Sequence, residues 1–401
     1  MPESTQLAVV GAGPAGLAAA RQAAELGLEV TLIDERPGRQ DVPPGAQLLA
    51  ETTAWGIFDG TALALRGPTV CSLLRAQAIV LATGAYDRPF AFPGCTLPGV
   101  SAVSELAPLP GRRVVLVGTG PQLSSAERRQ REAGADVAAV VEGVLVRVER
   151  DGSALSAVVA LLGPDGTALL GEAHRLAADA IGVAYGLLPA TELLRQAGGR
   201  VEYSEEAEAW LPVRSASLEA LPGLFVAGDA AGARGERIAE AEGRASAVEA
   251  ARTLGVLSDA EAARRLEASD PPPAESYHAA LSPIACVTPE TVVCACEGVT
   301  AGQVAVALDE GARTTRELRS YTRLGMGRCQ GRMCGATAEA MLRERLGPGA
   351  PAPEPLSVRP PVKPVPLEAL ALLVPRPTSA AGRRTDASAR PSRPGSAGPL
   401  R

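Results

Sequence analysis

Two close pairs of cysteines stand near the end of the chain, Cys294-Ala-Cys296 and Cys329-Gln-Gly-Arg-Met-Cys334. Thiolates are soft ligands that bind transition metals, and two pairs brought together can hold one metal centre. Iron–sulfur clusters and zinc both accept four cysteines. The spacing therefore predicts a centre bound by Cys294, Cys296, Cys329 and Cys334, with iron–sulfur and zinc as the alternatives.

A glycine-rich turn, Gly11-Ala-Gly13-Pro-Ala-Gly16, lies between an apolar run at 7–10 and an alanine-rich stretch of helical character. In a dinucleotide fold, the first glycine permits the turn, the second admits the diphosphate and the third lets helix and strand pack closely. The helix N-terminus favours phosphate, and an acid after the next strand can bind a ribose hydroxyl. We expect nucleotide contacts from Gly11, Gly13, Pro14, Ala15, Gly16, Asp34 and Glu35.

Two later segments fit the same fold. Ala82-Thr83-Gly84 ends the apolar run 78–82, and its small residues let the chain pass close to a cofactor. Gly228-Asp229 ends another apolar run. In flavoproteins with two dinucleotide-binding domains, an Asp at this position contacts the ribityl–phosphate region of the flavin. The order of these motifs describes an FAD domain with contacts at Thr83, Gly84, Gly228 and Asp229. Beside such a domain, electron transfer favours iron–sulfur over zinc.

A second glycine turn, Gly118-Thr-Gly120, follows the apolar run 113–117. Leu123 stands where the third glycine would be, and Glu142 stands where a ribose-binding acid would be. This incomplete pattern is compatible with NAD(P), with another adenine nucleotide, or with no ligand. The candidate contacts are Gly118, Gly120 and Glu142.

The expected fold class is α/β, a flavoprotein with two dinucleotide-binding domains and a small helical four-cysteine module. Strands are expected over 62–65, 70–74, 78–82 and 136–142, a β-meander over 144–170, and helices over 300–310 and 313–320. In the module, Val304, Val306, Leu308 and Leu318 should cover one side of the cluster. The expected divisions are 1–110 with 206–255 (FAD domain), 111–205 (nucleotide-binding-like domain), 256–283 (linker), 284–345 (module), 346–374 (Pro-rich extension) and 375–401 (disordered tail).

Composition narrows the classes of function. The 401 residues carry a net charge of −6, and only 3% are aromatic, which argues against nucleic acid as a partner. No charged and apolar leader precedes Leu7, and no apolar run is long enough to span a bilayer. We therefore expect a cytoplasmic protein with reduced cysteines. Lys363 is the only lysine among 39 basic residues, which we interpret as codon bias.

With these residues assembled, the chain resembles the α subunits of heteromeric amino-acid and opine dehydrogenases. That family includes the B subunit of hydrogen cyanide synthase, the A subunit of opine oxidase, and proline or hydroxyproline dehydrogenase α subunits. The cysteine region also resembles the bacterioferritin-associated ferredoxin module. The stretch between Asp34 and Ala82 is shorter than the family pattern. The segments that carry the resemblance are 82–89, 92–100, 294–300, 322–334 and 359–366.

The resemblance implies FAD, a [2Fe–2S] cluster, and a separate β subunit similar to D-amino-acid oxidase. That subunit would oxidise an amino acid of proline, hydroxyproline, opine or glycine type, and this chain would relay the electrons to an acceptor. No residue here is assigned as catalytic. One alternative is a self-contained NAD(P)H-dependent FAD oxidoreductase that passes electrons through the cluster. A second alternative is a scaffold subunit with structural nucleotides.

Overall fold

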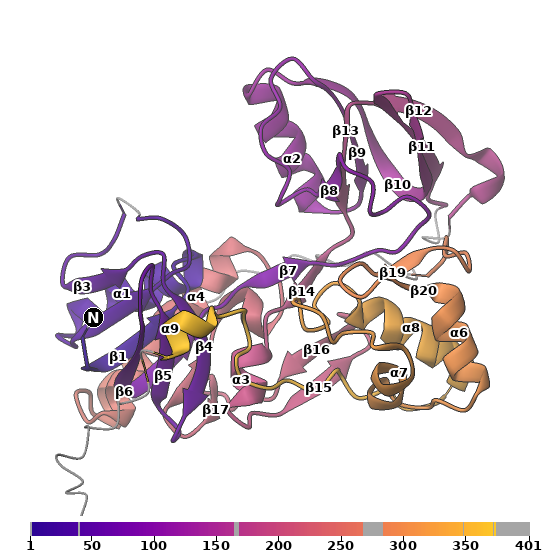
Figure 1. Ribbon diagram of the computed structural model, residues 1–401. Coiled ribbons are helices and arrows are strands. Elements are labelled where there is room, and N and C mark those ends of the chain that lie inside the picture. Colours follow the sequence, from indigo (N-terminus) through magenta and orange to yellow (C-terminus); the bar gives the residue numbers. More distant parts are fainter. Residues whose placement is uncertain are drawn as a thin grey trace, which may run out of the picture.

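The computed structural model describes residues 2–38, 41–163, 168–267, 284–347 and 349–371, together with Leu373. Figure 1 shows three parts: a first domain that contains the N-terminus, an inserted domain above, and a C-terminal module beside the first domain. Residues 164–167 of the expected β-meander and the expected tail at 375–401 lie outside the described residues. Within the described residues, no helix is long and apolar enough to cross a membrane.

The first domain is built on a sheet in the order β17-β18-β6-β1-β2-β3, in which β18, β6, β1, β2 and β3 are parallel. Helices α1 and α4 pack together over this sheet. Strand β5 pairs antiparallel with the first half of β6, and β4 pairs antiparallel with β5. The elements are β1 (Ser4–Val10), α1 (Pro14–Glu25), β2 (Val30–Ile33), β3 (Ala46–Leu49), β4 (Thr53–Phe58), β5 (Ala62–Arg66), β6 (Cys71–Leu81), β17 (Glu219–Leu221), β18 (Leu224–Val226), η2 (Gly228–Ala231), α4 (Glu236–Thr253) and α5 (Asp259–Glu267).

Two expected pairs of strands are single strands in the structure. The runs 70–74 and 78–82 form one strand, β6, whose burial alternates in its first half and becomes continuous at 78–81. Its first half pairs with β5 on one side, whereas its second half lies between β1 and β18. The strand expected at 136–142 likewise continues as β10 to Asp151, because β11 pairs with its second half.

The inserted domain has a six-stranded sheet in the order β12-β11-β10-β9-β13-β8. Antiparallel strands β7 and β14 carry the chain into and out of it (Figure 1). We expected this unit to span 111–205, but its sheet also takes in β8, and Leu193 of α3 lies in the first domain's core. The elements of the inserted domain are β8 (Val100–Ala102), β9 (Arg113–Gly118), α2 (Pro121–Glu132), β10 (Asp136–Asp151), β11 (Ala154–Leu161), η1 (Leu170–Glu172), β12 (His174–Ala178) and β13 (Ala180–Ala184). The connecting strands are β7 (Ala85–Asp87) and β14 (Leu187–Pro189), and α3 (Glu192–Gln196), β15 (Val201–Ser204) and β16 (Ala209–Pro212) follow outside the six-stranded sheet.

The expected linker 256–283 begins with a helix. Helix α5 packs against α4, because Leu257 and Ala262 are buried in the same core as the inner face of α4. Of the remainder, residues 268–283 lie outside the described part of the chain.

The C-terminal module is small and mostly helical. Thr300 and Thr314 begin α6 and α7 with capping boxes, which satisfy backbone N–H groups that a helix start leaves free. Val304, Leu308 and Leu318 pack with Cys294 and Cys334 in its core, as expected, but Val306 is 56% exposed. The expectation for Val306 was wrong because it lies on the outer face of α6. The elements are β19 (Val292–Cys294), β20 (Val299–Thr300), α6 (Ala301–Asp309), α7 (Thr315–Thr322), α8 (Gly335–Leu346) and, in the extension, α9 (Leu367–Ala371).

Candidate functional site

The glycines of the first turn have different roles in the structure. A Cβ on Gly11 would lie 2.2 Å from the Ala82 carbonyl oxygen, and one on Gly16 would lie 1.8 Å from the Gly11 carbonyl oxygen. A Cβ on Gly13 would meet nothing within 4 Å, and its backbone is extended. Packing therefore explains Gly11 and Gly16, whereas Gly13 leaves a cradle open beside the N-terminus of α1, where a diphosphate would lie.

Asp34 is held at the end of β2 and is only 7% exposed. Its carboxylate accepts hydrogen bonds from the Ala12 N–H at 2.6 Å and the Arg36 N–H at 2.8 Å. Burial by itself raises the pKa of Asp34, but these bonds and the Arg36 charge outweigh it, so the pKa lies below its usual value. Asp34 is therefore an ionised acceptor beside the glycine turn.

A cavity of about 610 Å³ lies in front of this turn. It brings together six of the expected nucleotide contacts: Gly11, Gly13, Asp34, Glu35, Thr83 and Gly84. The Thr83 hydroxyl donates to the Ala190 carbonyl at 2.8 Å, and Gly84 has a φ of +72°, which favours glycine. The strand end at 82–84 therefore forms a wall of the same cavity as the glycine turn.

Five other contacts expected in the FAD domain do not line this cavity: Pro14, Ala15, Gly16, Gly228 and Asp229. A Cβ on Gly228 would lie 2.7 Å from the Ala15 Cβ, so these two residues belong to the packing between η2 and α1. Pro14 begins α1 and faces a second hollow between α1 and α4. Burial, and then the neighbouring Glu242 carboxylate, raise the pKa of Asp229. The structure places Asp229 beside this packed region and not in the wall of the cavity.

The second glycine turn has a different structure. Gly118 and Gly120 have positive φ angles and lead into α2. Leu123, at the third glycine position, is 3% exposed and packs in the core between α2 and the sheet. Glu142 lies in the middle of β10, exposed, and pairs in register with Gly118. Gly118, Gly120 and Glu142 therefore lie near the carboxyl end of β9, and the Glu142 side chain is exposed.

The four paired cysteines gather around the loop 325–334. Cys294 and Cys334 are buried, Cys329 is half-buried and Cys296 is exposed. Burial raises the pKa of the Cys334 thiol, and the charge of Cys294, a hydrogen bond with it, and the charge of Cys329 add to the effect. Cys296 lies against the same loop, because a Cβ on Gly327 would lie 2.2 Å from the Cys296 Cβ.

Among the described residues, no three Cys, His, Asp or Glu side chains are arranged to hold a single metal ion. Zinc requires its ligands to converge on one ion. A [2Fe–2S] cluster needs only two ligands at each of two irons. The four thiols, in two pairs around one loop, fit the two ligands that each iron of such a cluster takes.

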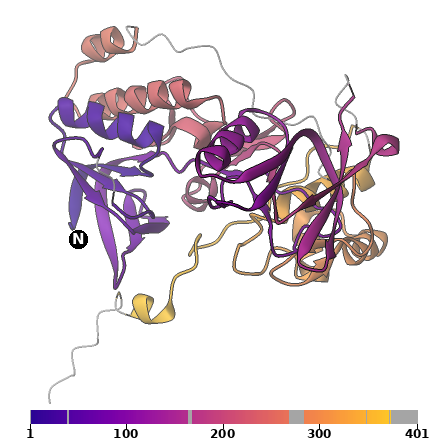
Figure 2. The same cartoon turned by 90° about the horizontal axis from the view of Figure 1, so that it is seen from above.

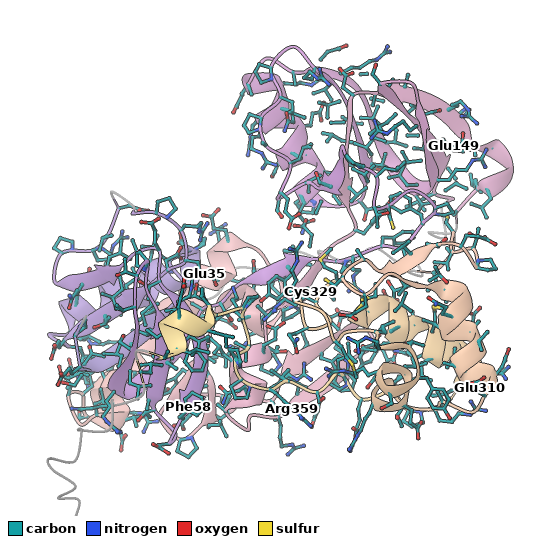
Figure 3. All side chains as sticks on the ribbon, viewed as in Figure 1. Glu35, Phe58, Glu149, Glu310, Cys329 and Arg359 are labelled. Carbon is teal, nitrogen blue, oxygen red and sulfur yellow. The ribbon has the colours of Figure 1, made fainter. Side chains whose placement is uncertain are left out.

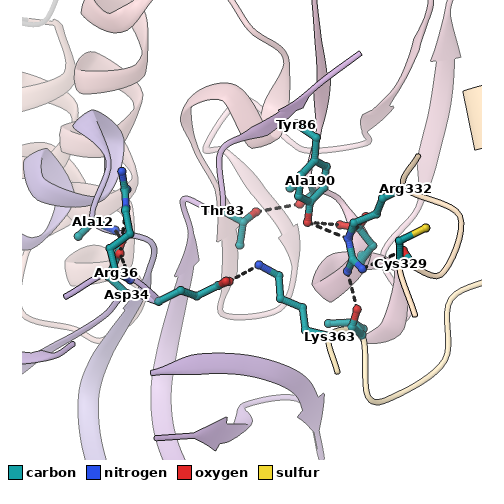
Figure 4. Close-up of polar contacts among 12 residues, drawn as sticks. Ala12, Asp34, Arg36, Thr83, Tyr86, Ala190, Cys329, Arg332 and Lys363 are labelled. Atoms are coloured by element: carbon teal, nitrogen blue, oxygen red, sulfur yellow. Dashed lines mark hydrogen bonds and ion pairs between the residues drawn. The ribbon is translucent and has the colours of Figure 1, made fainter. Parts of the chain in front are cut away.

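One side chain of the loop 325–334, here called the cysteine loop, reaches the cavity of the first domain. Arg332, between Cys329 and Cys334, donates from Nε to the Tyr86 hydroxyl at 3.0 Å and forms an ion pair with Glu192 at 3.1 Å (Figure 4). Its Nη1 donates to the Cys329 carbonyl at 3.1 Å. Burial, and then the charge of Glu192, raise the pKa of Tyr86 well above its usual value, so its hydroxyl stays protonated.

Tyr86, Glu192 and Arg332 all line the cavity, so one side chain connects the two candidate cofactor sites. Figure 3 places Cys329 at the junction of the module with the rest of the molecule. This connection was not predicted from the sequence. The position of Tyr86 two residues after Gly84 was the one local signal of it.

Comparisons with known proteins agree with this geometry. Residues 5–56 match the family described as pyridine nucleotide-disulphide oxidoreductase, and residues 292–344 match the BFD-like [2Fe-2S] binding domain. These matches imply FAD and a [2Fe–2S] cluster. All four paired cysteines lie inside the second match.

Relatives cover nearly the whole chain. The A subunit of opine oxidase from Rhizobium meliloti (strain 1021) is 31% identical over 91% of this chain and 98% of its own length. Hydrogen cyanide synthase subunit HcnB from Pseudomonas protegens is 27% identical over 84% of this chain and 92% of its own. The first alignment spans 454 residues, more than this chain contains, so that relative has segments absent here.

The fold has a solved counterpart. The crystal structure of L-proline dehydrogenase from P. horikoshii matches with a TM-score of 0.74 and 23% identity, over 92% of this chain and 79% of that one. The expected α/β flavoprotein fold with an iron–sulfur module is confirmed. The chain is an FAD-dependent oxidoreductase, and it belongs to the family that contains the A subunit of opine oxidase.

Proposed function

We propose that this chain is the electron-transferring subunit of a heteromeric FAD-dependent amino-acid dehydrogenase. FAD binds in the cavity beside Gly13 and Asp34, and a [2Fe–2S] cluster binds to Cys294, Cys296, Cys329 and Cys334. The observation that carries the proposal is the reach of Arg332 from the cysteine loop to Tyr86 and Glu192 in the cavity wall.

The side chains around Arg332 have definite tasks in this proposal. A flavin exchanges electrons in pairs or singly, and an iron–sulfur cluster carries them one at a time. The Arg332 guanidinium supplies fixed positive charge between the two sites and holds the cysteine loop against Tyr86. Glu192 orients the guanidinium. Fixed charge of this kind needs no rearrangement when an electron moves.

Substrate oxidation belongs to a partner in this proposal. The relatives are named as subunits of opine oxidase and hydrogen cyanide synthase, which supports a hetero-oligomer. We assign the amino-acid chemistry to a β subunit similar to D-amino-acid oxidase. Its substrate is an amino acid of proline, hydroxyproline, opine or glycine type, and this chain passes the electrons to an acceptor.

Anaerobic spectroscopy tests whether substrate oxidation belongs to the partner and electron transfer to this chain. With proline, hydroxyproline, glycine or an opine, the purified chain should show no flavin bleaching. Addition of a D-amino-acid-oxidase-like chain from the same organism should allow one of these substrates to reduce both cofactors. Bleaching of the lone chain by micromolar NADH or NADPH would instead favour the self-contained oxidoreductase, with a working site at Gly118, Gly120 and Glu142. One equivalent of zinc without iron would favour the scaffold.

A matched pair of variants tests the role of Arg332. Arg332→Met should slow reduction of the cluster by reduced flavin about tenfold, since it removes one charge-assisted contact between the sites. Arg328→Met removes a cation from the same loop, but Arg328 is exposed and does not line the cavity, so it should leave the rate unchanged. Equal rates in both variants would contradict the proposed connection.

A further inference from the structure

The Pro-rich segment 349–366, here called the strap, is fixed to both cofactor-binding parts of the molecule. At the module, Leu356 is buried in the core and the Thr315 hydroxyl donates to the Glu354 carbonyl at 2.9 Å. At the first domain, Val362 is 2% exposed and its N–H donates to the Trp55 carbonyl at 2.9 Å. Figure 2 shows the strap crossing from the module to the first domain.

The anchor at Val362 fixes the position of the next residue, Lys363. Both residues line the cavity that contains Gly13 and Asp34. The Lys363 ammonium forms an ion pair with Glu35, across 328 residues of sequence (Figure 4). The Arg332 guanidinium also donates to the Val362 carbonyl, so the strap and the cysteine loop hold each other beside the cavity.

Carboxylates line much of the cavity, and they favour a cation in its wall apart from the glycine turn. Asp34, Glu35, Glu105 and Glu192 contribute carboxylates, and a dinucleotide adds two phosphates. Arg36 is paired with Asp34, Arg332 with Glu192, and Lys363 with Glu35. The Lys363 ammonium has three N–H donors, so donors remain for a phosphate beside Glu35. The N-terminus of α1 supports the phosphates on one side only. Lys363 is the cation on the strap side, and its long flexible stem lets the ammonium choose its anion.

We propose that Lys363 binds a phosphate of the dinucleotide in this cavity. The strap places Lys363 in the cavity wall, and Glu35 orients its ammonium. The inference rests on the proposed FAD site and extends it to the C-terminal extension. The strap then contributes to cofactor binding as well as to packing. Its loss should release nucleotide even though the glycine turn is intact.

The single lysine makes a selective test possible. Acetic anhydride should acetylate Lys363 and the N-terminal amine of the full chain, and mass spectrometry of peptides separates the two. Saturating FAD or ADP should slow acetylation of Lys363 about tenfold or more, the size of one charge-assisted hydrogen bond, with the N-terminal amine as internal control. Equal acetylation of Lys363 with and without FAD would overturn the inference.

Binding measurements give a second, independent test. Lys363→Met should weaken FAD and ADP binding about tenfold, and Lys363→Arg should largely restore it. Arg359→Met is the matched control, because Arg359 is an exposed cation of the same strap outside the cavity. Unchanged affinity in Lys363→Met would overturn the inference alone. Failure of the unmodified chain to bind FAD would instead refute the proposed function.

Discussion

The two glycine turns of this chain look alike in sequence but are built differently. In β1-α1-β2, Gly16 packs so closely on the Gly11 carbonyl that no side chain fits, and Asp34 is buried behind the turn. In β9-α2-β10, Leu123 fills the equivalent position and Glu142 lies exposed within a continuing strand. Leu123 packs in the core between α2 and the sheet, and β10 continues past Glu142 because β11 pairs with its second half.

The comparison separates glycines required for packing from the glycine that we propose is required for a ligand. Gly16 is confined by backbone atoms, whereas Gly13 faces open space.

The largest contrast is expected between Gly13→Val and Gly16→Val. Gly13→Val should fold with the melting temperature of the FAD-free unmodified chain but retain less than about a hundredth of the FAD affinity, because its side chain occupies the diphosphate cradle. Gly16→Val should not yield folded protein, because its Cβ would overlap the Gly11 carbonyl. For both variants, circular dichroism measures folding and melting, and the FAD released on denaturation measures cofactor binding. Normal FAD content in Gly13→Val would disprove the assigned cradle.

Cys329→Ser should remove the visible absorption of the cluster and loosen the module, while FAD stays bound. A core this small gains much of its stability from the metal centre. Iron analysis and electron paramagnetic resonance of dithionite-reduced protein provide the measurement. Isolated Cys286, in the core of the inserted domain, supplies the control, and Cys286→Ser should retain full iron content.

Leu123→Ala should lower the free energy of unfolding by about 3 kcal/mol, as for other buried leucines. The variant should not gain NADH-dependent flavin reduction, because Glu142, the candidate ribose-binding acid, stays exposed. Urea denaturation and anaerobic mixing with NADH provide the two measurements. A gain of rapid reduction would mean that Leu123 alone blocks a working second site.

The smallest effects are expected at the two acids. Asp34→Asn should weaken FAD binding about tenfold, whereas Glu142→Gln should leave it unchanged. The pKa of Asp34 is lowered in the folded protein from an ordinary 3.8. Its carboxylate therefore contributes stability that is present above about pH 4 and is lost as the pH falls toward the folded pKa.

Urea denaturation at about pH 5 and about pH 3 measures this difference. The unmodified chain should lose more stability over that interval than Asp34→Asn does. Equal losses would show that Asp34 does not carry the linkage.

The local chemistry of this protein could be predicted from its amino-acid sequence. The turn Gly11-Ala-Gly13-Pro-Ala-Gly16, the strand and helix that flank it, and the paired cysteines follow from short-range patterns. They were sufficient for the fold class and the family. Leu123 was also recognised as a departure, because the third glycine position has a fixed spacing in the motif.

The contacts between these segments depend on the tertiary fold and could not be predicted. Arg332 contacts Tyr86 across 246 residues, and Lys363 contacts Glu35 across 328. Local spacing carries no information about such contacts, because they depend on where the module docks and where the strap is anchored. The face of Val306 and the burial of α5 against α4 were likewise set by neighbouring elements. Packing between distant segments, which has no sequence period, therefore joined the two cofactor sites.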